Sequence, residues 1–571
     1  MKFKPVFVGI AVIGVLLLVL SLSSVAKVFA ANPRDLLTGV KTQPLAAQLL
    51  SKRSPFFISF LVDPEKLGLF TQLAAKPNDR ASVRHELDNL KLQLQQNWLL
   101  NYDRDIQPWL DREISLAITD ADLDKHPENG LQSGYLLAFV AKDANLAKTT
   151  IGDFWQRLAI NGSDLGFEQY QGVSILSTGL IADRPAIAGT TFGNFVLFAN
   201  DASVIRQAID NLQSPSLALA SLDTYRDRLT KIETGKIGVA YANLAELGES
   251  FPQESLLIGF SLDRAGIRAK TLWNLEKSDP KLEPATESSD RQSTSRSSKP
   301  KVSKKSNANI TAELPSGSSV IIGNNLGQTL QDVSRSLSPE SQKGLTKAIA
   351  SLLGNSDISL DGNIWEWAKD DYAIAVLPSQ NSSRNSDPDW LLVAKVNDAK
   401  TSETGIAALD DLARNKLTVG QISLKTQPVT VWTKLSAIAN DSKSGVSSEL
   451  SGSIVAAHTQ TPNYIYLSNS LKALESAITL KDSLAASKIF KATNAKLPRD
   501  RQTYGYISTS DLNTLKTKLL SQASNTNDIN EIFQKFGNSP LGSILKHLEV
   551  FSFVTNSDTN SQNDELFLFI K

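Results

Sequence analysis

Cysteine is absent from the 571-residue chain, and methionine occurs only once, at position 1. The absence of cysteine excludes disulfides, thiolate nucleophiles, cysteine zinc sites and iron–sulfur clusters. Histidine is scarce, with only His85, His126, His458 and His547 present. None of the four has a neighbour at the spacing of H-E-x-x-H or another short metal motif. A histidine metal site would therefore need ligands from distant segments of the chain.

An excess of charge of either sign is also missing. Lysine plus arginine total 59, and aspartate plus glutamate total 59. The whole chain therefore has no basic field of the kind that attracts nucleic acid, and no nucleic-acid partner is predicted.

The sequence lacks the usual local signatures of catalysis. It contains no G-x-S-x-G elbow, no G-x-x-x-x-G-K-[ST] phosphate loop and no G-x-G-x-x-G that opens a helix after a strand. Hydrolase, nucleotidase and dehydrogenase activities lose their usual support. No catalytic residue, no cofactor and no enzyme activity is predicted, and a hydrolase with an active site built from distant segments stays the second alternative.

The N-terminus, in contrast, carries a clear signal. Lys2 and Lys4 precede an uncharged run from Val6 to Leu22. The small-residue end at 28–30 fits a cleavage site, but the run exceeds the roughly 7 to 15 residues of a usual signal core. About 17 to 25 apolar residues span a bilayer. Residues 1–31 are therefore expected to be a signal peptide or a membrane anchor, with the single-pass anchor favoured and secretion the alternative if the segment is cleaved. The lysines place the remaining chain across the membrane.

The chain repeats itself. A chain this long exceeds the roughly 250 to 300 residues at which single cores stop growing. Residues 54–276 can be laid on residues 310–571, and Trp109 then meets Trp367 at a shift of 367 − 109 = 258. A core role is favoured for these two tryptophans over a carbohydrate or pigment platform.

Further matches follow in the same order along both copies. In each, a strand leads to an aspartate-capped helix, and a later strand, turn and amphipathic helix lead to a closing pair of strands. The matched pairs include Asp143 with Asp398, Asn200 with Asn469, Ala208 with Ala477 and Gly238 with Gly505. The matched apolar triplets are Ile151, Phe154 and Leu158 in the first helix and Ile406, Leu409 and Ala413 in the second.

These patterns predict an α+β fold in two tandem copies, each a mainly antiparallel sheet covered by helices. The expected domains are 32–276 for the first repeat and 310–571 for the second. Residues 277–309 are rich in serine, lysine and proline and are expected to be a disordered linker. Its basic part, 291–305, is interpreted as a solvated linker, with contact to anionic lipid or an acidic partner as the sharper alternative.

One loop resembles the start of a calcium site. Oxygen ligands alternate at the beginning of "DADLDKHPENG" and are followed by an acidic residue, which gives the candidate set Asp120, Asp122, Asp124 and Glu128. The calcium-loop template requires glycine at position 6 and glutamate at position 12, whereas this chain has Lys125 and Leu131. An ordinary polar loop between two strands is therefore favoured over a metal site.

The first copy resembles a known family. The runs that carry the resemblance are "NPRDLLTG" from Asn32, "SPFFISFLVDPEKL" from Ser54, "DIQPWLDREISLAITDADLD" from Asp105, "FWQRLAINGSDLGFEQYQGV" from Phe154 and "FVLFANDASVIRQAIDNLQSP" from Phe195. They are similar to a cyanobacterial family of uncharacterised exported proteins that is grouped as a domain of unknown function. The resemblance implies a membrane-anchored protein facing the periplasm or the thylakoid lumen, and it brings no activity or catalytic residue.

The functional prediction is a non-catalytic protein-interaction or assembly factor, tethered to the membrane by its N-terminal segment. Two related domains on a flexible linker can hold two sites on one partner, and a tether raises effective concentration to about millimolar. The expected partner is an envelope or thylakoid protein, and no oligomeric state is predicted. The first alternative is a carrier of a hydrophobic ligand, either a lipid or a pigment.

Overall fold

The computed structural model describes residues 43–65, 91–128, 132–179, 186–247, 253–275, 310–335, 365–377, 389–498, 503–511 and 548–570, with short gaps inside several ranges. The predicted anchor, 1–31, and the predicted linker, 277–309, lie outside the described residues. No helix among the described residues combines the length and apolar character that a membrane span needs.

The chain divides into two compact units. The first contains Met1–Leu275, Leu520–Val550 and Asp558–Lys571, and the second contains Glu276–Leu519 and Phe551–Ser557. The end of the chain therefore belongs to the first unit.

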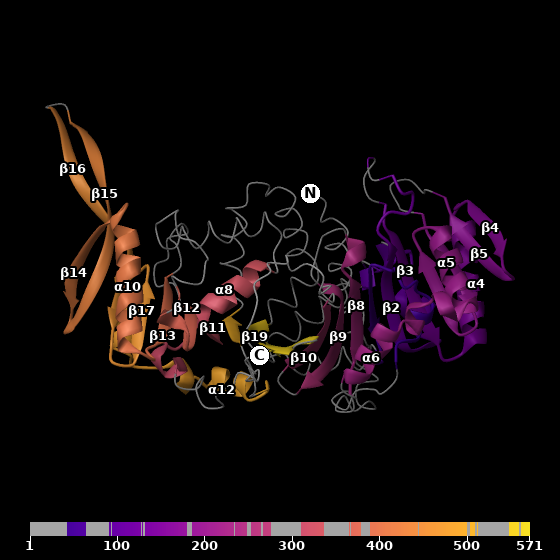
Figure 1. Ribbon diagram of the computed structural model, residues 1–571. Coiled ribbons are helices and arrows are strands. Elements are labelled where there is room, and N and C mark those ends of the chain that lie inside the picture. Colours follow the sequence, from indigo (N-terminus) through magenta and orange to yellow (C-terminus); the bar gives the residue numbers. More distant parts are fainter. Residues whose placement is uncertain are drawn as a thin grey trace, which may run out of the picture. The chain divides into compact units, whose positions relative to one another are not determined.

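The first unit is built on one antiparallel sheet (Figure 1). Its strands lie in the order β4-β5-β6-β7-β3-β2-β1-β8-β9-β10, and β20 (Ser561–Ile570) pairs with β10. The strands are β1 (Phe56–Phe60), β2 (Leu110–Asp120), β3 (Gly134–Ala141), β4 (Leu165–Tyr170), β5 (Val173–Thr178), β6 (Ala188–Phe192), β7 (Phe195–Ala199), β8 (Gly238–Asn243), β9 (Gln253–Asp263) and β10 (Gly266–Leu275).

Both faces of this sheet are buried. Successive residues of a strand point to opposite faces, and in β1 Phe57 belongs to one core cluster while Ile58 belongs to the other. Helix α4 (Ala144–Ile160) contributes Phe154 to the cluster of Ile58, and α5 (Ala202–Gln213) contributes to that of Phe57. The shorter elements are η3 (Leu45–Gln48), η4 (Tyr102–Ile106), η6 (Pro215–Leu217), η7 (Leu219–Ser221), α6 (Asp223–Lys231) and η8 (Ala245–Leu247).

The second unit repeats this order. Its strands lie as β14-β15-β16-β17-β13-β12-β11-β18, all antiparallel. The elements are η9 (Thr311–Glu313), β11 (Ser319–Asn324), α8 (Leu326–Arg335), β12 (Asp371–Val376), β13 (Trp390–Lys395), α10 (Ala399–Arg414), β14 (Thr418–Leu424), β15 (Gln427–Ser442), β16 (Gly445–Gln460), β17 (Tyr464–Ser468), α11 (Leu471–Ile478), η11 (Leu484–Ala486), α12 (Lys488–Asn494), β18 (Thr503–Ser508) and β19 (Leu548–Asp558). The predicted α+β class with antiparallel sheets in two similar units is confirmed.

Matched polar residues make the same hydrogen bonds in both units. The side chain of Asp143 caps α4, and that of Asp398 caps α10, each by accepting from backbone N–H groups of the first turn. The Asn200 side-chain oxygen accepts from the backbone N–H of Tyr135 at 2.7 Å, and Asn469 accepts from Trp390 at 2.9 Å. The polar residues matched in the sequence therefore make equivalent hydrogen bonds in the two units.

The matched tryptophans are core residues, as predicted. Trp109 is fully buried just before β2, and Trp367 is 3% exposed before β12. The Trp109 ring meets Phe139 edge-on, with centroids 5.9 Å apart. Burial against the sheet leaves neither indole as a surface platform.

The two units differ in the length of two matched strands. Strands β5 and β6 contain 6 and 5 residues, whereas their counterparts β15 and β16 contain 16 each. In Figure 1 the two longer strands extend past α10 as a two-stranded ribbon. The extra length lies beyond the layer that covers the core.

Candidate functional site

The ribbon formed by β15 and β16 has two unlike faces. Antiparallel partners point to the same side of a sheet, and alternate residues of one strand share a face. Both faces are covered at the ribbon's base: Trp432 belongs to the core cluster that includes residues of α10, and Val429 and Val431 on the other face are 0% and 7% exposed. Leu435 lies on the opposite face, because its number differs from 432 by an odd number of residues.

Three exposed apolar side chains share that opposite face. The pairing of Thr433 with Ile454 puts Ile454 on the side of Leu435, and the pairing of Ile422 with Val429 puts Ile422 there too. The exposed fractions are 54% for Leu435, 42% for Ile454 and 39% for Ile422. This surface, called the ribbon face below, consists of Ile422, Leu435 and Ile454.

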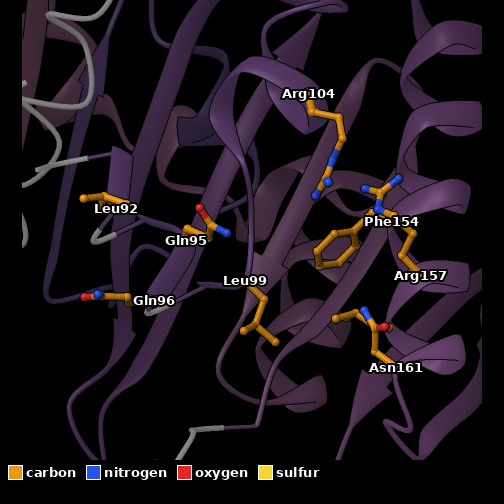
Figure 2. Close-up of a pocket in the computed structure, with 9 residues that line it drawn as sticks. Leu92, Gln95, Gln96, Leu99, Arg104, Phe154, Arg157 and Asn161 are labelled. Carbon is orange, nitrogen blue, oxygen red and sulfur yellow. The ribbon is translucent and has the colours of Figure 1, made fainter. Parts of the chain in front are cut away.

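A pocket of about 480 Å³ lies in the first unit. Its lining comes from α4, from η4 and from a helical stretch before Leu99, and consists of Leu92, Gln95, Gln96, Leu99, Arg104, Phe154, Arg157, Leu158 and Asn161. Positions 154, 157 and 158 fall on one side of α4 because residues three and four apart are neighbours on a helix. Figure 2 shows the side chains of Arg104 and Arg157 close together above Phe154.

Asp105 holds both arginines in place. Its carboxylate is fully buried and accepts from the Arg104 Nε at 2.8 Å and Nη2 at 3.1 Å, from the Arg157 Nη2, and from the backbone N–H of Asn101 at 2.9 Å. The hydrogen bond to Asp105 raises the pKa of Arg104 above its ordinary value. Two guanidinium groups share one carboxylate, which leaves one net positive charge at this end of the pocket.

Backbone strain accompanies the pocket at Leu99. Its φ is +58°, in the left-handed region that non-glycine residues seldom adopt. Such conformations persist only where the surrounding structure enforces them, and they concentrate at binding and active sites. The strained residue places a leucine on the pocket wall.

A second polar cluster joins helix α10 to the ribbon's base. The Asp410 Oδ1 is 2.9 Å from the His458 Nε2 and accepts from the Trp432 indole N–H at 2.7 Å. Burial alone would raise the pKa of Asp410, but His458 and Trp432 outweigh it and hold that pKa below its ordinary value. A histidine–aspartate pair also orients the base in hydrolases, so this cluster is where a catalytic site would be sought.

A third cluster, around Glu113, fixes η3 to the sheet. The Glu113 carboxylate accepts from the backbone N–H groups of Leu45 and Ala46 at 2.9 and 2.8 Å and from the Ser59 hydroxyl at 3.0 Å. Burial raises the pKa of Glu113 despite these bonds. Its donors are the start of η3 and its neighbours in the sheet, so the geometry indicates a structural role.

The candidate calcium loop connects β2 to β3 and is bonded to itself. Asp120 accepts from the Lys125 Nζ, Asp122 from the backbone N–H of Gln132 at 3.0 Å, and Asp124 from the side-chain amide of Gln132 at 2.7 Å. The Glu128 carboxylate lies 3.0 Å from the His126 ring. In the described part of the chain, no group of three or more histidines and carboxylates is placed to hold a metal ion. The favoured polar loop has the predicted position between two strands.

Sequence reasoning missed the Asp105 and Asp410 clusters. Asp105 and Arg157 are 52 positions apart, and Asp410 and His458 are 48 apart, so neither pair has a local spacing to detect. His458 was visible only as an isolated histidine. The local signal for the first cluster was Asp105 itself, an acidic residue that follows Arg104 and lies four positions before the matched Trp109.

The fold and these sites define a duplicated α+β protein with an antiparallel sheet in each unit, an arginine-lined pocket in the first and a long ribbon in the second. The chain belongs to the family described as "protein of unknown function (DUF3352)", whose model matches residues 10–540. The expected family of unknown function is thus confirmed, while cyanobacterial origin and export remain predictions.

Other comparisons add little. No curated protein matches the chain. Among solved structures, crystal form III of TP0453 is 8% identical with a TM-score of 0.22, covering 42% of this chain and 83% of that one. Crystal form I of the same protein is 10% identical with a TM-score of 0.22, covering 42% and 81%. TM-scores of this size do not define a shared fold.

Proposed function

We propose that the protein is a non-catalytic, membrane-tethered interaction factor whose ribbon face binds a partner protein of the same membrane. The observation that carries the proposal is the row formed by Ile422, Leu435 and Ile454 on one side of an extended ribbon. Exposed apolar side chains gathered on one face are typical of interaction surfaces. Both sides of the ribbon's base are covered, by Trp432 on one side and by Val429 and Val431 on the other. Leu435 and Ile454 lie farther along the ribbon and remain exposed.

The comparison between the units supports a role beyond folding. The first unit completes the same strand order with β5 and β6 of 6 and 5 residues. The additional residues of β15 and β16 are therefore not needed to form such a sheet. A two-stranded ribbon is marginally stable on its own, and covering its apolar face by a partner would remove that surface from water.

A free edge lies beside the ribbon face. Strand β14 pairs with β15 on one side, and within the described residues no strand pairs with its other side. Unpaired backbone groups at such an edge can add a strand from another chain. The edge strand contributes Ile422 to the ribbon face, so backbone pairing and side-chain burial can occur on one partner.

The membrane part of the proposal comes from the sequence. The apolar run from Val6 to Leu22 supports an anchor, and the composition of 277–309 supports a flexible linker. Together they would confine the second unit to the partner's membrane and raise its effective concentration there. The carrier and hydrolase alternatives assign no role to the ribbon face.

Two matched double variants test the proposal. Leu435→Lys with Ile454→Lys adds two charges to the ribbon face, while Ser436→Lys with Ser453→Lys adds the same two charges to the opposite face of the same strands. Affinity purification after crosslinking in native membranes should recover a stoichiometric membrane-protein partner with the wild type and with the serine variant. The Leu435 and Ile454 variant should lose it. Equal recovery with both variants, or no partner with the wild type, would overturn the proposal.

A further inference from the structure

The pocket beside α4 has a charged end and an apolar end. We propose that it binds an amphiphile with an acidic headgroup, a carboxylate or a phosphate, and an aliphatic chain. The headgroup would contact Arg104 and Arg157, and the chain would lie against Leu99 and Leu158. The volume of about 480 Å³ falls within the roughly 300 to 1,000 Å³ of small-molecule sites.

The charged end has hydrogen-bond donors left for a ligand. Asp105 uses the Nε and Nη2 of Arg104 and the Nη2 of Arg157. Within the described part of the chain, the Nη1 groups of both arginines make no hydrogen bond to Asp105 or to another lining residue. The side chains of Arg104 and Arg157 are 57% and 33% exposed, so both heads reach solvent. One net positive charge on two oriented guanidinium groups is complementary to one acidic group.

The other acidic residue of η4 does not cancel this excess. Asp103 precedes Arg104 on η4 and accepts a hydrogen bond from the Lys91 Nζ at 2.8 Å. The charges of Asp103 and Lys91 therefore balance one another. Asp105 is fully buried beneath the arginines and points its oxygens at them. The carboxylate therefore orients the guanidinium groups before a ligand arrives, which lowers the entropy cost of binding.

The apolar end is incompletely covered. Leu92 is 52% exposed, and Leu99 lines the pocket from a strained backbone. Figure 2 shows Phe154 between the arginines and Leu99. Because this ring is 1% exposed, an elongated ligand bound to the arginines would contact mainly the half-buried Leu99 and Leu158. An aliphatic chain there would gain roughly 25 cal/mol for each Å² of apolar surface removed from water.

The second unit shows that the fold does not require this site. The shift that superposes Asp143 on Asp398 is 398 − 143 = 255, and the same shift places Arg157 on Leu412. Helix α10 thus occupies the position of α4 without an arginine there. The shift of 258 that matches the two tryptophans places Asp105 on Asn363, so the buried carboxylate and the arginine are both particular to the first unit.

Three probes with the same aliphatic chain distinguish a carboxylate from a phosphate headgroup. Full-length protein in nanodiscs of zwitterionic lipid is dialysed to equilibrium against dodecanoate, dodecyl phosphate or dodecanol, with empty nanodiscs as the blank. At least one acidic probe should bind about tenfold more tightly than dodecanol, because hydrogen bonds to charged groups are the stronger ones. Binding of dodecanoate alone assigns a carboxylate, and binding of dodecyl phosphate alone assigns a phosphate headgroup.

Variants separate the two ends of the pocket. Arg157→Gln should weaken the acidic probe about tenfold and leave dodecanol unchanged, whereas Leu158→Ser should weaken every probe. The control is Arg206→Gln, which changes an arginine paired with Glu168 elsewhere in the unit. If Arg157→Gln does not fold, added salt must weaken acid binding by the wild type. Equal affinity for dodecanol and the acids, binding no higher than the blank, or unchanged acid binding by folded Arg157→Gln would overturn the proposal.

Discussion

Asp105 illustrates how a single buried carboxylate can organise a site. Its side chain is fully buried, and its partners Arg104 and Arg157 retain partial exposure. Asp105→Asn would leave two guanidinium groups facing an uncharged amide. The free energy of unfolding should fall by about 2 to 3 kcal/mol, less than for a wholly buried pair because solvent screens the arginines.

Urea unfolding of the full chain measures this effect. Asp103→Asn is the control, since Asp103 is 53% exposed and pairs with Lys91, and its cost should stay within about 1 kcal/mol. An equal loss in both variants would show that Asp105 has no special structural role.

Asp410 gives a pH-dependent prediction. Its folded-state pKa lies below the ordinary value of 3.8, because the bonds from His458 and Trp432 outweigh burial. A depressed carboxyl pKa stabilises the fold above the unfolded pKa, and this contribution disappears as the pH falls through the folded pKa. The free energy of unfolding should therefore fall as the solution is acidified below about pH 4.

The matched variant is Asp410→Asn, which removes the titrating group. At neutral pH it should be less stable by about 1 to 3 kcal/mol, because the hydrogen bonds to a charged acceptor are lost. The gap between wild type and variant should close at acidic pH in denaturant titrations. A gap that stays constant down to the lowest pH would contradict the assigned role of the Asp410 carboxylate.

At the scale of elements, we expect that most of the ribbon can be removed while the second unit still folds. Replacing residues 435–452 by Asn-Gly would join Lys434 to Ser453, which already face one another across the two strands, through a two-residue hairpin turn. The first unit's short strands indicate that the remaining sheet is sufficient. The melting temperature should change by only a few degrees, on the order of 1 kcal/mol, while partner recovery is lost.

Calorimetry and the membrane crosslinking assay on the same preparation give the two readouts. A collapse of the melting transition would show that the ribbon belongs to the folding core, and the proposed separation of ribbon and fold would be wrong.

The elements also show what a single sequence can reveal. Asp143, Asp398, Asn200 and Asn469 were detectable because caps and turns use short polar residues at fixed offsets from apolar helices, and the order of elements followed from repetition. The strand order could not be predicted from the repeat, because pairings such as β3 with β7 join segments separated by a helix and several strands. The length of the ribbon was also hidden, since its polar and apolar residues lack a clean alternation.

At the scale of the whole molecule, two long-range contacts could not be predicted from the sequence. Strand β20 at the end of the chain pairs with β10 of the first unit, although the sequence repeat assigns β20 to the closing strand pair of the second copy. The Arg157 and Asp105 contact likewise joins residues with no local pattern. The repeat predicted which elements exist, while long-range pairing depends on packing energies that no short window contains.

The ribbon face is the surface through which we propose that a membrane-protein partner is bound. The most direct measurement places a photoactivatable benzoyl-phenylalanine at Leu435 or, separately, at Ser436 in the full chain. These adjacent positions point to opposite faces of the ribbon. Illumination of native membranes should give one dominant adduct with a membrane protein from position 435 and little or none from 436. Equal adducts from both positions, or none from 435, would contradict the account.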